Sequence, residues 1–73
     1  MKVEMIILAF QQGDPVTYDS KDEGINQILI EDGKVRIDFV DNGRSWAREI
    51  PISNLRFFEY PVDTVDYRNG YKV

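Results

Sequence analysis

Two closely spaced dipeptides, Asp32-Gly33 and Asn42-Gly43, constrain the fold of this sequence more than any other feature. Both central residues of a two-residue type I′ hairpin turn need positive φ, and Asp-Gly and Asn-Gly tolerate that backbone best. Each dipeptide lies between stretches in which apolar and polar residues alternate, which is the pattern of half-buried strands. We therefore predict a meander of three antiparallel strands joined by two tight turns.

Two-residue loops at both places also fix which residues face each other. The predicted pairs are Ile30 with Val35, Ile28 with Ile37, Asn26 with Phe39, Phe39 with Trp46, Ile37 with Arg48 and Val35 with Ile50. A slip of one residue would turn every side chain of a strand to the other face. One face should then be apolar and face the interior: Ile28, Ile30, Val35, Ile37, Phe39, Trp46 and Ile50. The other carries Gln27, Leu29, Arg36, Asp38, Ala47 and Glu49, with Arg36 across from Glu49.

The flanking segments complete a recognisable order of elements. We predict a strand over residues 2–10, a long loop through Val16-Thr17-Tyr18, a tight turn at residues 51–54 and a last strand over residues 55–60. This order, together with residues 49–55, resembles that of SH3-like barrels. The resemblance implies an all-β fold, either a small antiparallel SH3-like barrel or a strongly twisted five-stranded sheet. The domain would span residues 1–60, and residues 61–73 would form a C-terminal tail or short hairpin packed on it.

The resemblance stops at the fold. SH3 domains that bind proline-rich peptides resemble one another in an aromatic-rich motif on the long first loop, where this chain offers only Tyr18 among acidic residues. Their tryptophan opens the strand after the second loop, whereas Trp46 lies just past a tight hairpin. Recognition of proline-rich ligands is therefore not expected.

Composition narrows the chemistry. The chain has 73 residues, no cysteine and no histidine, so we expect one domain that folds without zinc, disulfide or cofactor. The net charge of -4 disfavours a general nucleic-acid binder. The apolar run at residues 5–10 is too short to span a membrane and follows Glu4. We expect a cytoplasmic protein without a membrane partner.

The sequence offers little for catalysis. Ser20, Ser45 and Ser53 have no recognisable neighbouring base, and the paired carboxylates lie at predicted loop tips, where water solvates them. The run Asp19, Asp22 and Glu23 lacks the spacing of a calcium-binding loop. We interpret that run as a solvated acidic loop and expect no enzymatic activity and no metal site.

Arg48 is the one charge on the predicted apolar face, and three accounts compete for it. In the first, Arg48 lies near an edge of the fold and reaches water or a carboxylate such as Glu4 or Glu59. In the second, it joins Trp46 and Arg44 in a ligand-binding patch. In the third, the predicted register is wrong.

The last strand is the second aromatic-rich segment. Alternation places Arg56, Phe58 and Tyr60 on one side and Leu55, Phe57 and Glu59 on the other. Aromatic residues on both faces need a cover. One candidate cover is the tail, with Val62, Val65, Tyr67 and Tyr71 and a turn at Asn69-Gly70. A second protein surface is the other candidate.

Together these features predict a non-enzymatic binding protein that occupies the surface of a protein partner. A small regulator or inhibitor of the phage or mobile-element accessory type would fit this size, and a homo-oligomer is also compatible. The alternative is binding of a small anionic ligand, a nucleotide or single-stranded nucleic acid. In either case the candidate binding residues are Arg44, Trp46, Arg48, Arg56, Phe58 and Tyr60.

Overall fold

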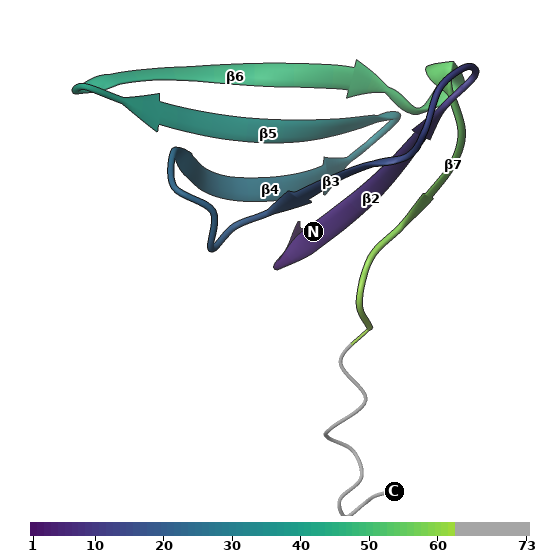
Figure 1. The fold of residues 1–73 in the computed structure, drawn as a ribbon, viewed down its shortest axis with the longest axis horizontal. Coiled ribbons are helices and arrows are strands. Elements are labelled where there is room, and N and C mark those ends of the chain that lie inside the picture. The colour runs from purple at the N-terminus through teal and green to yellow at the C-terminus, as the bar shows by residue number, and fades with distance from the viewer. Residues whose placement is uncertain (63–73) are drawn as a thin grey trace, which may run out of the picture.

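The computed structural model describes residues 1–62, and they form an all-β structure with antiparallel strands, as predicted (Figure 1). Two sheets contain all the strands of this part of the chain, one with the order β1-β4-β5-β6 and one with the order β3-β2-β7. The strands are β1 (Lys2–Val3), β2 (Met5–Phe10), β3 (Val16–Asp19), β4 (Ile25–Glu31), β5 (Lys34–Asp41), β6 (Arg44–Pro51) and β7 (Leu55–Glu59).

The predicted meander is confirmed in β4, β5 and β6. Ile30 faces Val35, Ile28 faces Ile37, Phe39 faces Trp46, Ile37 faces Arg48, Val35 faces Ile50 and Arg36 faces Glu49. The predicted pair of Asn26 with Phe39 is wrong. A register shift between Ile25 and Gln27 places Ile25 opposite Phe39 instead. This irregularity lies where β4 leaves the loop, and there the Val40 amide donates to the Gly24 carbonyl at 2.9 Å.

The two hairpin turns differ in backbone conformation. Asn42 and Gly43 have φ of 51° and 78°, so both residues are left-handed, as a type I′ turn requires. In the other turn Gly33 has φ of 76°, but Asp32 is not left-handed. The prediction of type I′ geometry at Asp32-Gly33 is therefore wrong, although its two-residue length and its register are right.

The second sheet differs most from the sequence prediction. The strand predicted over residues 2–10 breaks at Glu4, so that β1 pairs with β4 and β2 pairs with β3 and β7. The segment predicted as a loop through Val16-Thr17-Tyr18 forms β3 and pairs with β2. Its β-branched and aromatic residues favour a strand, and β2 supplies the partner that a reading of short-range pattern did not reveal.

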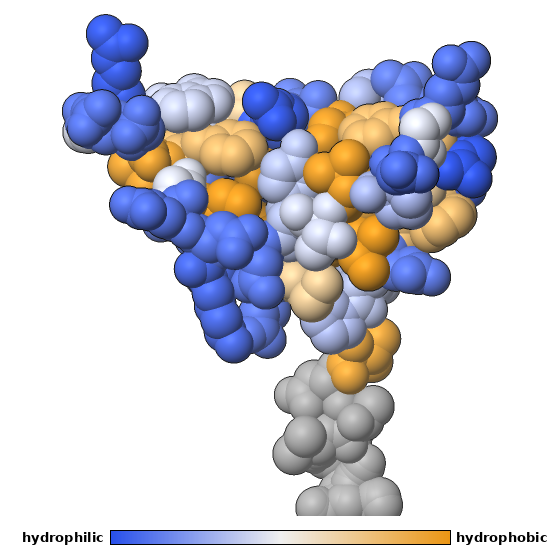
Figure 2. All heavy atoms as spheres, in the orientation of Figure 1, coloured by the Kyte–Doolittle hydropathy of each residue, from blue (hydrophilic) through white to orange (hydrophobic). Residues whose placement is uncertain are grey.

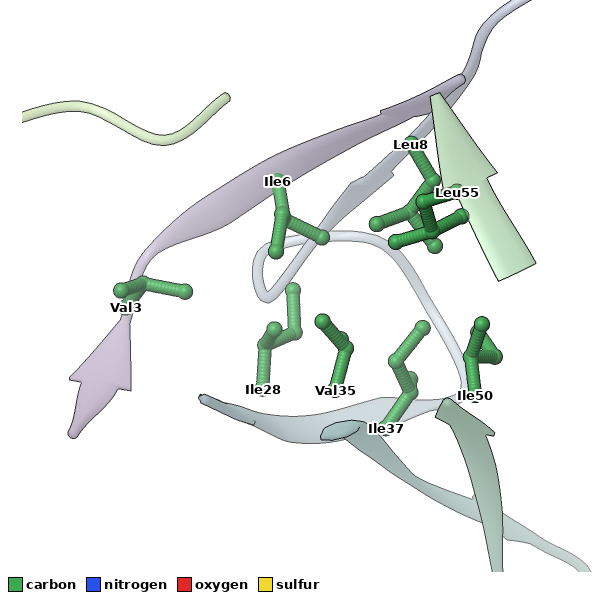
Figure 3. Close-up of a cluster of buried hydrophobic side chains, with 8 residues drawn as sticks. All are labelled: Val3, Ile6, Leu8, Ile28, Val35, Ile37, Ile50 and Leu55. Carbon is green, nitrogen blue, oxygen red and sulfur yellow. The ribbon is translucent and has the colours of Figure 1, made fainter. Parts of the chain in front are cut away.

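The hydrophobic core lies between the two sheets, where their apolar side chains point toward one another (Figure 3). Ile6 and Leu8 of β2 meet Ile28, Val35 and Ile37 from the meander, and all five are fully buried. Val3, Ile50 and Leu55 complete the cluster. The strand pairs of the described residues leave two separate sheets facing each other, and no ladder among them closes a barrel.

A single turn of 3₁₀ helix, η1 (Ile52–Asn54), joins β6 to β7, which confirms the predicted tight turn. The Ile52 amide donates to the Gly33 carbonyl at 3.0 Å. This hydrogen bond joins η1 to the tight turn between β4 and β5. Of the residues predicted to cover β7, Val62 is 71% exposed, and the others fall on residues 63–73, outside the described residues. Within residues 1–62 the structure contains no helix that is long and apolar enough to cross a membrane.

Candidate functional site

Trp46 lies on the predicted face of β6 but outside the core. The hairpin of β5 and β6 extends well past the strands of the second sheet at its Asn42-Gly43 end (Figure 1). Trp46 belongs to this overhanging part, and 47% of its surface is exposed. The sequence placed Trp46 on the correct face of β6, but the prediction that it would be buried in the interior was wrong. The sequence pattern shows on which face of a strand a residue lies, but not how far the opposite sheet extends.

Three aromatic side chains and one arginine gather on this overhanging face. Phe39 and Trp46 are directly opposite each other, and their rings stack with centroids 5.6 Å apart and planes inclined by 16°. Phe39 also meets Tyr18 of β3 in an edge-to-face contact, with ring centroids 6.3 Å apart. Aromatic contacts of these two kinds each contribute about 0.5–1.5 kcal/mol beyond area burial. We call Tyr18, Phe39, Trp46 and Arg48 the Trp46 cluster.

Arg48 connects the two sheets within this cluster. Its guanidinium carbon lies 5.0 Å from the centroid of the Phe39 ring, and its Nη1 donates a hydrogen bond to the Tyr18 hydroxyl at 3.1 Å. The register is as predicted, which removes the account based on a register error. Neither carboxylate considered for Arg48 forms an ion pair with it, and Glu4 pairs instead with Lys21 at 2.9 Å. Arg48 thus lies at an edge, as in the first account, and contacts Phe39 and Tyr18, which the sequence did not suggest.

A groove of about 640 Å³ adjoins the exposed tryptophan. Phe39 and Trp46 form its aromatic wall. Carboxylates line it from two directions, since Glu23 belongs to the loop before β4 and Asp41 to the end of β5. Within residues 1–62 neither of these carboxylates forms an ion pair. The remaining lining residues are Gly24, Val40 and Asn42. Figure 2 shows hydrophilic residues around the tip of the overhanging hairpin.

On the opposite face of the meander, charged side chains pair with neighbours on the same face. Asp38 accepts hydrogen bonds from Gln27 Nε2 at 2.6 Å and from Arg36 Nε at 2.7 Å. The bond from Gln27, followed by the bond and charge of Arg36, lowers the pKa of Asp38 below its ordinary value. Lys34 pairs with Glu49 at 3.2 Å. This face is therefore less suited to recognition than the face that carries Trp46.

The candidate residues of β7 lie in the other sheet and do not join the Trp46 cluster. A register shift between Ala9 and Phe10 disturbs the ladder with β7. As a result Leu55 and Phe58 both contribute to the core, whereas Phe57 is 43% exposed. The predicted alternation, with Leu55 and Phe58 on opposite sides, was wrong because a bulge breaks the period of two.

The bulge also gives Arg56 partners of its own. Its Nε donates to the Phe10 carbonyl at 2.6 Å, and its guanidinium carbon lies 5.7 Å from the centroid of the Phe57 ring. Tyr60 stacks on Phe58 with centroids 6.1 Å apart. Tyr60 also lines a hollow of about 560 Å³ beside residues 1–4 and 61–62. The six predicted binding residues therefore form two groups, one on β6 and one on β7 together with Tyr60, which directly follows it.

Arg44 stands opposite Asp41 where β6 begins, and it shares the face of Trp46 by alternation along the strand. No hydrogen bond or ion pair joins the side chain of Arg44 to another residue of the described part. Among the three arginines proposed from sequence, Arg48 and Arg56 are thus engaged within the protein, and Arg44 is the one that the described contacts leave uncommitted.

Sequence reasoning missed four residues of this surface. Phe39 was assigned to the interior, Tyr18 to a loop and Glu23 to a solvated acidic loop, and Asp41 was assigned no role. The strand-forming residues around Tyr18 were a signal that could have placed it in a sheet. No local pattern could have placed Glu23 and Asp41 at one groove, because they line it together only once β4 and β5 have paired.

Within residues 1–62 no three acidic side chains gather closely enough to hold a metal ion. Comparison of the chain with protein-family models, with curated proteins and with solved structures gave no match.

Proposed function

We propose that this chain is a non-catalytic protein-binding domain whose Trp46 cluster and adjoining groove hold a basic segment of a protein partner. The observation that carries the proposal is the half-exposed Trp46, fixed by its stack on Phe39 at the open end of the sheet. A tryptophan held in place before binding presents a large contact area at little further cost in side-chain entropy.

The charges of the groove indicate the sign of the partner. Glu23 and Asp41 line it without internal ion pairs, and the whole chain has a net charge of -4. A lysine or arginine of the partner could lie over the Trp46 ring and pair with these carboxylates. Aromatic residues and complementary charges are the combination enriched at binding hot spots.

The alternative, binding of an anionic ligand or single-stranded nucleic acid, has less support. It requires arginines that are available to phosphate, and Arg48 and Arg56 already donate to Tyr18 and to the Phe10 carbonyl. Arg44 alone offers little attraction beside Asp41, because phosphate binding depends on several cations acting together.

Two finer inferences accompany this proposal. We infer that the fold is a variant of the SH3-like barrel, because β2, a long excursion, the meander, η1 and β7 follow one another in that order. We also infer that the chain acts as a small cytoplasmic regulator or inhibitor, because its sequence is short and contains neither cysteine nor histidine.

Panning a library of random peptides against the immobilised chain tests the proposed function. We expect enrichment of peptides that contain lysine or arginine beside apolar residues. Binding of the selected peptides should fall at least tenfold in Trp46→Ala and in Glu23→Gln/Asp41→Asn, and it should weaken with added salt.

Phe57→Ala is the matched control, since Phe57 is an aromatic residue nearly as exposed as Trp46 but lies on β7, in the other sheet. This variant should bind the selected peptides as the unmodified chain does. Enrichment of acidic peptides, or equal loss of binding in Trp46→Ala and Phe57→Ala, would contradict the proposal.

A further inference from the structure

The outer edge of β6 is the longest unpaired strand edge in residues 1–62. β6 is the last strand of its sheet and spans Arg44–Pro51, whereas β1, β3 and β7 are shorter edge strands. An unpaired edge presents a row of amide and carbonyl groups to which another strand can bind.

The hairpin geometry shows which groups face outward. In a two-residue hairpin the residues flanking the loop, here Asp41 and Arg44, exchange both of their backbone hydrogen bonds, and such pairs then alternate along the ladder. Ser45, Ala47 and Glu49 therefore direct their amides and carbonyls away from β5. Pro51 continues this series, and it has no amide hydrogen to donate.

The features that usually block edge pairing are sparse on β6. Its ladder with β5 runs from Asp41–Arg44 to Lys34–Pro51 without a register shift, and the strand contains no lysine. By contrast, β3 follows Pro15 directly, and the ladder of β7 is bulged. Arg48 is the one charged residue of β6 that points to the inner side at mid-strand, where it would oppose an unsuitable partner strand.

We propose that β6 pairs antiparallel with β6 of a second copy of this chain, about a twofold axis that passes beside Ala47. The two four-stranded sheets then form one continuous sheet. The proposal rests on the unpaired backbone edge of β6 and holds whether or not the Trp46 cluster binds a peptide, although Trp46 and Arg48 also lie beside the new strand pair.

The sequence of β6 is complementary to itself in this one register. Ser45 lies opposite the partner's Glu49, and Trp46 lies opposite the partner's Arg48. Cross-strand pairs of an aromatic ring with a guanidinium, and of a hydroxyl with a carboxylate, are favourable. The small Ala47 lies at the axis, so the centre of the interface holds neither a charge nor a bulky group.

The neighbouring registers bring like charges together. An axis beside Trp46 would set Arg44 against the partner's Arg48. An axis beside Arg48 or Glu49 would set that residue against its own copy. Like charges directly opposite each other destabilise a strand pair. An axis beside Ser45 would leave most of the strand unpaired. Charge complementarity therefore selects the Ala47 register.

Solution mass gives the first test. The full chain should show a concentration-dependent mass of twice the 8.5 kDa monomer in sedimentation equilibrium. Ala47→Pro removes an outward amide but no hydrogen bond to β5, and an edge strand tolerates proline on its solvent side. This variant should stay folded by circular dichroism and become monomeric. Ala47→Val keeps the amide and should stay dimeric.

Cross-linking tests the register, and the absence of cysteine from the chain makes single-cysteine variants unambiguous. Ala47→Cys should cross-link to itself efficiently with a short bismaleimide reagent, because the two copies face each other. Ser45→Cys should not, because the two copies would lie four residues apart along the strands, about 13 Å.

Three results would overturn the proposal. They are a monomer for the unmodified chain at high micromolar concentration, a dimer that survives Ala47→Pro, and cross-linking through Ser45→Cys in preference to Ala47→Cys. Ala47 does not line the groove, so peptide binding measured with the monomeric Ala47→Pro variant tests the proposed function apart from the dimer.

Discussion

The guanidinium of Arg48 lies over the ring of Phe39, 5.0 Å from its centroid, although the two residues are diagonal rather than direct neighbours in the ladder of β5 and β6. Trp46 stacks on the same ring. Arg48 thereby acts as part of the support of Trp46, and its charge is directed toward Tyr18 rather than toward a ligand.

The hydrogen bond between Arg48 and Tyr18 should stabilise the fold modestly. We expect Tyr18→Phe to lower the free energy of unfolding by less than about 1 kcal/mol, since the bond is exposed to water. Arg48→Met should cost more, because it also removes the cation from Phe39. Urea unfolding of both single variants and the double variant measures their coupling. Strictly additive effects would show that the bond contributes nothing.

Asp38 should make the stability of the domain depend on acid pH. Its pKa lies below the ordinary 3.8 in the folded protein, so the ionised carboxylate stabilises the fold above that pH. The contribution disappears as the pH falls through the folded-state pKa. Between about pH 4 and pH 2 the urea midpoint of Asp38→Asn should therefore fall less than that of the unmodified chain. Gln27→Met removes the hydrogen bond that lowers the pKa of Asp38 most. The decrease of its urea midpoint over this pH range should be intermediate between those of the other two proteins. Equal acid dependence in all three would exclude this role for Asp38.

The two hairpin turns should respond differently to proline. Asp32 does not have a left-handed backbone, so Asp32→Pro should change the free energy of unfolding by no more than about 1 kcal/mol. Asn42 has φ of 51°, which proline cannot adopt, so Asn42→Pro should cost more than about 1 kcal/mol. Thermal unfolding measures both variants. Similar losses would mean that both turns have the same conformation in solution.

The meander was the part of the fold most open to prediction. Asp32-Gly33 and Asn42-Gly43 lie directly between the strands that they connect, and nearly all the predicted cross-strand pairs are present. The turn type at Asp32 was not predictable, because a two-residue loop with glycine in second place is compatible with more than one backbone conformation.

The second sheet was harder because its pairs join distant segments. Nothing local to Tyr18 shows that β3 lies beside β2, and nothing local to Glu4 shows that the first strand divides between two sheets. The bulge that turns Leu55 and Phe58 to the same core leaves no glycine or proline as a signal. The candidate site suffered from the same limit, since its groove is lined both by the loop before β4 and by the hairpin of β5 and β6.

Fluorescence of Trp46 tests the central claim most directly, because it is the one tryptophan of the chain and lies at the proposed binding surface. Two ligands are titrated in parallel, a lysine-rich peptide selected by panning and free of tryptophan, and a single-stranded oligonucleotide. We predict a saturable, salt-sensitive change with the peptide, lost in Glu23→Gln/Asp41→Asn, and no change with the oligonucleotide. A saturable response to the oligonucleotide with none to the peptide would contradict the account.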